Sequence, residues 1–200
     1  MTELDTATTA RAADPRPNLA RVLDQTETLV LTTDPADRGL PTPCTDFDVA
    51  TLVEHLLAVV RRVGVVVRGE PFFSVPRLWP STDWAGDWAD GRSGTDAALA
   101  TADLDRLVEV PWGRVPARAA VASYVGELAT HGWDLAVATG RRHLLDEQIA
   151  ASALPATLAK IPAEPRGEDV PFGPVVPVAD GAAATDRLVA WLGRDPAWRP

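Results

Sequence analysis

Apolar residues recur every three or four positions along several stretches of the chain, which is the spacing of one face of an α-helix. The first stretch opens with two prolines suited to a helix start and predicts a helix over residues 17–33. The second predicts a helix over residues 47–68, with Thr45 or Asp46 as its cap. Its apolar positions are Val49, Leu52, Val53, Leu56, Val59, Val60 and Val63.

Further along the chain, helical patterns alternate with segments rich in turn-forming residues. Residues 70–95 hold Trp84 and Trp88 among Pro, Gly, Ser and Asp, and we expect a long surface loop there, with one helical turn around these tryptophans. The segment LVEVPWGRV at 107–115 predicts a short hairpin or extended turn. The remaining predicted helices are 95–104, whose start can lie earlier, 116–138, 147–160 and 185–192.

Helices dominate this pattern, and the short connections between them favour an antiparallel helical bundle, so we expect an all-α fold. The polar lead of residues 1–14 is predicted to be disordered, and residues 15–160 are predicted to form the bundle. Residues 161–200 are predicted to be a short irregular C-terminal extension packed on the bundle. Its PFGPVVPV run alternates proline with valine and therefore cannot form a central strand.

Composition and charge narrow the classes of function. Acidic residues outnumber basic residues 28 to 19, giving a net charge of -9, which argues against a nucleic-acid groove or a polybasic membrane face. No apolar run approaches the roughly 18 residues of a membrane span, and the charged N-terminal residues do not resemble a signal peptide. The single cysteine, Cys44, excludes an internal disulfide. We therefore expect a soluble, cytoplasmic protein.

Candidate chemistry centres on Glu127 and His131, which are four positions apart and so share one face of the predicted helix 116–138. Tyr124, Leu128 and Leu135 continue this face, which we expect to point into the core. A carboxylate and an imidazole are costly to bury unless they share a partner, and a divalent metal is one such partner. The alternative is a buried, hydrogen-bonded Glu–His pair without a metal.

His55 lies within the otherwise apolar stripe of the predicted helix 47–68. If helices 47–68 and 116–138 are neighbours, His55 completes a set of two imidazoles and one carboxylate, which is typical of catalytic zinc sites with an open coordination position. The alternative is a core histidine that is satisfied by hydrogen bonds. The order of residues is not that of HExxH, which argues against a zincin protease.

Two segments carry a resemblance to a known family. TPCTDFDVATLVEHL at 42–56 and GELATHGWDLAVATG at 126–140 resemble the DinB-like superfamily, and most closely its mycothiol-dependent maleylpyruvate isomerase N-terminal domain branch. The resemblance extends over residues 17–198, where the ending DRLVAWLGRDPAW is similar to that of an uncharacterised subgroup. It implies an up-and-down four-helix bundle with one divalent metal, usually zinc. The family's metal ligands fall on His55, Glu127 and His131.

Two further residues are candidates for catalytic roles. Asp134 lies three positions after His131 and can orient its imidazole or a bound water, although a surface aspartate near a helix end is the alternative. Arg62 lies two turns after His55 on the same face and can meet an anionic substrate, although a solvated arginine is the alternative. Cys44 is expected to be structural because Asp46 and Asp48 crowd it. No fourth strong ligand is expected on the helical faces that carry the set, and intrusion of Asp134 as a fourth ligand is the alternative.

The resemblance also implies a reaction. Metal coordination deprotonates a thiol, and in these enzymes the nucleophile is taken to be a low-molecular-weight thiol, mycothiol, rather than a protein cysteine. The expected partners are this thiol and a small electrophile, in S-transfer or isomerisation. Isomerase activity itself is less expected, because the isomerase proper has a larger C-terminal domain.

The main alternative is a non-catalytic metal-binding or interaction module with the same bundle. A third hypothesis is a purely structural bundle, in which His55, Glu127 and His131 form a buried hydrogen-bonded network without a metal. Neither nucleic acid nor membrane is expected as a partner, and the tryptophan-rich stretch 72–88 is a candidate surface for a homodimer.

Overall fold

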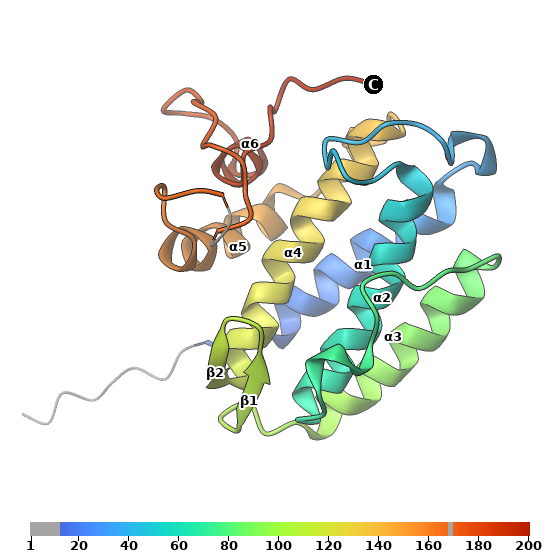
Figure 1. The fold of residues 1–200 in the computed structure, drawn as a ribbon, viewed down its shortest axis with the longest axis vertical. Helices are drawn as coiled ribbons and strands as arrows, with labels where there is room; N and C mark the ends of the chain where they lie inside the picture. Colours follow the sequence, from blue (N-terminus) through green and yellow to red (C-terminus); the bar gives the residue numbers. More distant parts are fainter. Residues whose placement is uncertain (1–12, 168–169) are drawn as a thin grey trace, which may run out of the picture.

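The computed structural model describes residues 13–167 and 170–200, and long helices form its body (Figure 1). The four helices of the bundle are α1 (Arg16–Thr32), α2 (Val49–Val67), α3 (Trp84–Thr101) and α4 (Ala117–Ala138). An antiparallel hairpin links α3 to α4 and consists of β1 (Leu107–Val110) and β2 (Gly113–Pro116). The C-terminal helices are α5 (Glu147–Lys160) and α6 (Ala184–Trp191). Short 3-10 turns are formed by Pro35–Asp37, Phe72–Ser74 and Arg142–Leu144. The all-α bundle with a C-terminal extension is confirmed. The predicted lead, residues 1–14, lies almost wholly outside the described residues.

The helices of the bundle do not alternate strictly in direction. Helix α4 packs against both α1 and α2, and α3 packs against α2 and α1. Helices α2 and α3 run parallel, because Gly91 lies against Val60 while Gly64, one turn further along α2, lies against Thr95. The hydroxyl of Thr95 also donates to the carbonyl of Val60. The chain direction therefore reverses at only two of the three connections between the bundle helices. The short loops had predicted an antiparallel arrangement throughout.

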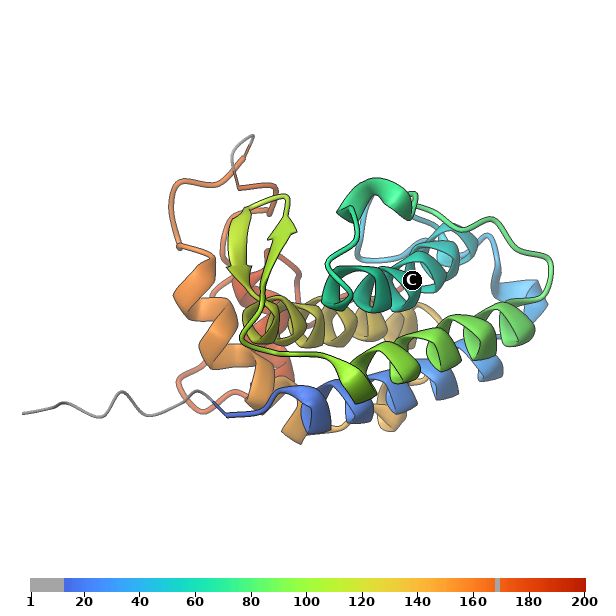
Figure 2. The same ribbon diagram turned by 90° about the horizontal axis from the view of Figure 1, so that it is seen from below.

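The reason lies in the link between α2 and α3, residues 68–83, which runs back along α2 (Figure 2). At its middle, the carbonyl of Pro76 accepts from the guanidinium of Arg62 in α2 at 2.6 Å. Further on, the amide of Trp79 donates to the carbonyl of Glu54 near the beginning of α2, at 3.0 Å. The link thus returns the chain to the end of the bundle where α2 began.

Helix α3 begins at Trp84, eleven positions before the predicted start of 95, so the prediction of a loop over 84–95 is wrong. The side chain of Asp83 caps it by accepting from the amide of Gly86 at 3.0 Å. Its first turns are rich in glycine and aspartate, so the sequence shows no hydrophobic periodicity there that would predict a helix. Gly91 is required by close packing, because a Cβ there would lie 2.9 Å from a methyl of Val60.

The loop before α2 is also built differently from the prediction. Asp48, rather than Thr45 or Asp46, caps α2 and accepts from the amide of Thr51 at 2.8 Å. Within the loop, the amide of Phe47 donates to the carbonyl of Cys44 at 2.8 Å. The hydroxyl of Thr42 donates to the carbonyl of Phe47 at 2.7 Å. These bonds hold Cys44 and Phe47 over the start of α2, beside the site described below.

The core is a continuous layer of leucine, valine and aromatic side chains between the helices. Fully buried members include Leu19, Leu23, Leu52, Leu56, Leu128, Leu135 and Trp88. The C-terminal extension adds a second, smaller cluster in which Val189 of α6 packs against Trp133 and Val137 of α4. Residues 170–178 of this extension form no strand.

No helix in the described part of the chain is long and apolar enough to cross a membrane.

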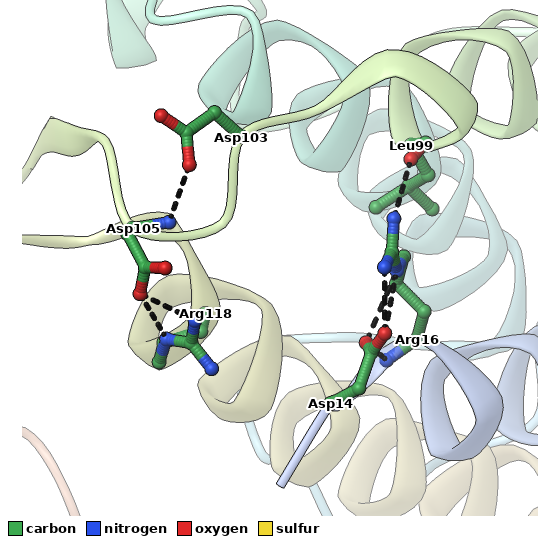
Figure 3. A network of polar contacts seen from close by, with 6 residues as sticks. All are labelled: Asp14, Arg16, Leu99, Asp103, Asp105 and Arg118. Atoms are coloured by element: carbon green, nitrogen blue, oxygen red, sulfur yellow. Dashed lines mark hydrogen bonds and ion pairs between the residues drawn. The ribbon is translucent and has the colours of Figure 1, made fainter. Parts of the chain in front are cut away.

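Polar contacts tie together the end of the bundle where α1 and α4 begin and α3 ends (Figure 3). The guanidinium of Arg16 pairs with Asp14 and donates to the carbonyl of Leu99, at the end of α3, at 3.3 Å. Arg118, at the start of α4, pairs with Asp105 in the turn that follows α3. These contacts are largely exposed, and we expect each to contribute at most about 1 kcal/mol to stability.

Candidate metal centre

Three side chains singled out in the sequence meet where α2 and α4 pack side by side in opposite directions. The Nε2 atom of His55 lies 3.5 Å from Oε1 of Glu127, and the rings of His55 and His131 lie 4.9 Å apart at 76°. Phe47 packs against both imidazoles from the loop before α2. His55 is buried, whereas the Glu127 side chain is 31% exposed, so the cluster opens to solvent on the Glu127 side.

The imidazole of His55 is oriented by the 68–83 link. Its Nδ1 atom lies 3.1 Å from the main-chain carbonyl oxygen of Arg77. A carbonyl oxygen can only accept, so Nδ1 must carry the proton. The Nε2 atom, which faces Glu127, therefore carries the lone pair that can bind a metal ion.

The imidazole of His131 is oriented by Asp134 on the same helix. Its Nδ1 atom lies 3.0 Å from Oδ2 of Asp134, whose side chain is fully buried. Burial raises the pKa of Asp134, but the charge of Arg194 and the hydrogen bond with His131 outweigh it and hold that pKa below its usual value. Asp134 is therefore ionised and accepts from Nδ1–H of His131, which leaves Nε2 of His131 free to bind a cation.

Arg62 is only 5% exposed. The alternative interpretation of the sequence, a solvated arginine, is therefore wrong. Its guanidinium donates to the carbonyl of Pro76, and the next carbonyl along the chain, that of Arg77, accepts from His55. It also lies over the ring of Phe72, 4.9 Å from the centroid. Arg62 thus fixes the segment that orients His55, and its contact with an anionic substrate stays a prediction.

Cys44 lies closer to the cluster than the sequence suggested. Its thiol and donor atoms of His131 and Asp134 all lie within 4.8 Å of one another, close enough to be a group of potential metal ligands. The helical faces that carry the set do not include Cys44, as expected, but the loop before α2 brings this potential ligand beside His131. The sequence did not reveal this proximity because a loop, rather than a helical face, brings Cys44 there.

Cys44, His131 and Asp134 are a weaker donor set than their proximity suggests. Both carboxylate oxygens of Asp134 already accept from Arg194, at 3.1 and 3.0 Å, so a metal ion there would lie beside a guanidinium. Burial raises the pKa of the Cys44 thiol, and the negative charge of Asp134 raises it further. The Cys44 thiol is therefore predominantly protonated at neutral pH.

Glu127 carries the negative charge of the set formed by His55, Glu127 and His131. Burial raises the pKa of Glu127, but the hydrogen bond with His55 and the charges of His55 and His131 lower it below its usual value. Burial and the charge of Glu127 raise the pKa of Tyr124, one turn earlier on α4, so this phenol stays protonated. One carboxylate and two imidazole nitrogens, each with the far nitrogen held by an acceptor, fit a divalent cation of the zinc type.

Several contributors could not be found from the sequence. The carbonyl of Arg77, the ring of Phe47 and the guanidinium of Arg194 come from a link, a loop and the C-terminal extension, none of which has a periodic pattern. His143 is exposed and lies outside the cluster. A hollow of about 540 Å³ lies on the loop before α2 and has Phe47 in its lining.

The fold and this cluster define a class: a helical bundle with a histidine- and carboxylate-lined centre between two antiparallel helices. A sequence model of the mycothiol maleylpyruvate isomerase N-terminal domain matches residues 19–136. The chain therefore belongs to this family of mycothiol-related, DinB-like domains.

The chain is also similar to two uncharacterised proteins of Mycobacterium tuberculosis, from strains CDC 1551 / Oshkosh and ATCC 25618 / H37Rv. Each is 30% identical over 156 residues, which cover 78% of this chain and 84% of the relative. No solved structure matches the chain.

Proposed function

We propose that this chain is a metal-dependent, thiol-utilising enzyme whose metal ion is held by His55, Glu127 and His131. The observation that carries the proposal is the shared arrangement of the two histidines. In each, Nδ1 is bound to an acceptor fixed by the fold, Arg77 or Asp134, so that Nε2 remains available to bind a metal ion. Such outer contacts set the tautomer that a histidine ligand needs.

Zinc is the cation that the donor set favours, because two imidazoles and a carboxylate are a common catalytic zinc combination. A divalent cation bound there would lower the pKa of an incoming thiol and supply a nucleophile at neutral pH. The residues of the chain position that cation. Glu127 contributes the negative charge, while Phe47 covers the two imidazoles on one side.

The protonated state of Cys44 supports an external thiol as the nucleophile. The pKa of Cys44 is raised by burial and by Asp134, so this thiol is a poor nucleophile at neutral pH. The family to which the chain belongs points to mycothiol, and the reaction we propose is S-transfer to, or isomerisation of, a small electrophile in the cytoplasm. Asp134 acts in this proposal by orienting His131 rather than by touching substrate.

The experiment has two stages. Elemental analysis of the purified protein should find close to one divalent metal per chain, and His131→Ala should remove most of it. The matched control is His143→Ala, which changes an exposed histidine outside the cluster and should retain the metal.

Metal-loaded protein should then accelerate conjugation of mycothiol to a generic electrophile such as 1-chloro-2,4-dinitrobenzene, and Glu127→Gln should abolish the acceleration. Stoichiometric metal in His131→Ala would contradict the ligand assignment. Metal binding without any acceleration, over a panel of thiols and electrophiles, would contradict the enzymatic part of the proposal.

One observation favours a second candidate function, a non-catalytic metal-binding module. The thiol of Cys44 lies within 4.8 Å of a donor atom of His131, close enough to become a fourth ligand after a small shift of its loop. Four protein ligands would close the coordination sphere, as in structural zinc sites. The Cys44→Ala variant separates the two functions, because only a closed site depends on the Cys44 thiol for metal binding.

A further inference from the structure

Arg194 belongs to the C-terminal extension and lies outside the segment 19–136 that the family match covers, yet it reaches the candidate metal centre. Its Nε and Nη2 atoms donate to Oδ1 and Oδ2 of Asp134 at 3.1 and 3.0 Å. Two parallel bonds between a guanidinium and a carboxylate fix the orientation of both planar groups. The same Asp134 oxygen, Oδ2, accepts from Nδ1 of His131.

The fold holds Arg194 in place independently of Asp134. Helix α6 packs against α4 through Val189, and the amide of Arg194 donates to the carbonyl of Val189 at 2.9 Å. Gly193, between them, has φ +81°, the left-handed conformation that ends a helix and turns the chain. Arg194 also donates from Nη1 to the carbonyl of Leu192 at 3.1 Å. The guanidinium is thus aimed at α4 by the end of α6.

Little else in the described residues restrains the Asp134 carboxylate. Both Asp134 and the guanidinium of Arg194 are largely withdrawn from water, with side-chain exposures of 0% and 12%. Without Arg194, the hydrogen bond with His131 would be the one that remains to the Asp134 carboxylate among the described residues. The imidazole of His131 would then lose the fixed acceptor that keeps the proton on Nδ1.

We propose that Arg194 is a positioning residue for the metal centre, acting through Asp134 on His131. The C-terminal extension thereby sets the tautomer and direction of one metal-binding imidazole. His55 receives the equivalent support from the 68–83 link, through the carbonyl of Arg77. The inference rests on the proposed function in so far as His131 binds a metal, but the arrangement of Arg194, Asp134 and His131 can be tested without one.

The test compares Arg194→Met and Arg194→Lys with Arg199→Met. Arg199 is an exposed arginine of the same extension, and its hydrogen bonds within the described residues go to nearby carbonyls. Zinc affinity is measured by chelator competition on the full chain. We expect Arg194→Met to weaken zinc binding by about 10- to 100-fold, the usual effect of removing such an outer contact. Arg194→Lys should recover part of the loss, and Arg199→Met should stay within twofold of the parent.

A second readout uses the metal-free protein. In ¹⁵N NMR spectra of the imidazoles, His131 should show Nδ1–H in the parent chain and a mixture of tautomers in Arg194→Met. If Arg194 acts through Asp134, the double variant Arg194→Met, Asp134→Asn should bind zinc no more weakly than Asp134→Asn alone. A merely structural role would lower the unfolding temperature without changing the His131 signal or the affinity of the folded fraction.

Wild-type zinc affinity together with an unchanged His131 tautomer in Arg194→Met would overturn the proposal. If Arg194→Met does not fold, Arg194→Lys decides, because an unchanged tautomer and affinity there would equally contradict the two-bond restraint. If the parent chain binds no zinc, the proposed function fails. The NMR comparison then still decides whether Arg194 positions His131.

Discussion

The imidazoles of His55 and His131 lie almost perpendicular to each other, with 4.9 Å between their centroids, although they come from different helices. Each donates its Nδ1 proton outward, His55 to the carbonyl of Arg77 and His131 to Asp134. Two histidines in a core could be satisfied by bonding to each other or to the helix that carries them. Here both outward bonds leave the Nε2 atoms available to bind a metal ion, and Nε2 of His55 faces Glu127.

The first prediction separates the enzyme from the metal-binding module through Cys44. In the enzyme, Cys44→Ala should leave thiol conjugation near the parent rate and change zinc affinity by less than threefold, because the pKa of Cys44 is raised and its thiol is protonated. In a closed site, loss of a thiolate ligand should weaken zinc binding by several orders of magnitude. The measurements are chelator competition and the conjugation rate on the same preparation. Cys44→Ser is the control for lost packing, because the serine side chain is close in volume to that of cysteine.

The second prediction concerns acid stability of the metal-free protein. The pKa of Asp134 is held below its usual value of 3.8 in the folded state, mainly by Arg194 against the opposing effect of burial. A depressed folded-state pKa contributes stability that is fully present above the unfolded value and is lost as the pH falls through the folded one. The free energy of unfolding of the parent should therefore fall more steeply below about pH 4 than that of Asp134→Asn.

Urea unfolding between pH 2.5 and 6 measures this difference. At pH 6, Asp134→Asn should be less stable than the parent by about 3 kcal/mol, because it leaves Arg194 buried without its counter-charge. Parallel pH dependences for the two proteins would show that folding does not lower the pKa of Asp134.

The sequence was a good guide wherever helical periodicity and fixed spacing carry the information. Glu127 and His131 share a face because they are four positions apart, and His55 joins them because α2 and α4 are neighbours. The start of α3 was missed because glycines and aspartates follow Trp84, so that packing against Val60 rather than amphipathicity stabilises that turn.

Contacts made by irregular segments were beyond the reach of the sequence. Cys44 comes close to His131 through a loop that is folded by Thr42 and Phe47. Arg194 meets Asp134 only because α6 docks on α4. Neither relationship follows from spacing along the chain, since both depend on where a non-periodic segment is packed.

The third prediction tests how the end of α6 is fixed. Gly193 has φ +81°, and a Cβ there would lie 2.7 Å from Cα of Gly173. Gly193→Ala should therefore combine left-handed strain of about 1–2 kcal/mol with a backbone clash, for a total loss of roughly 2–4 kcal/mol.

The matched control is Gly140→Ala. Gly140 has φ +69°, but a Cβ there would meet nothing within 4 Å, so only the strain of about 1–2 kcal/mol is expected. Denaturant unfolding compares the two. Equal losses would indicate that the contact between Gly173 and Gly193 relaxes without cost.

The last prediction distinguishes the side chain of Arg62 from that of Arg77. Arg62→Met removes the donor that holds the carbonyl of Pro76, next to the carbonyl of Arg77 that orients His55, so zinc binding should weaken about tenfold. Arg77→Ala removes a side chain that is 68% exposed and leaves the carbonyl in place, so zinc affinity should change by less than twofold. If Arg62 instead serves only to bind an anionic substrate, Arg62→Met should raise KM for an anionic electrophile while zinc affinity stays at the parent value. Chelator competition and steady-state kinetics on both variants therefore assign Arg62 either to the support of His55 or to substrate binding.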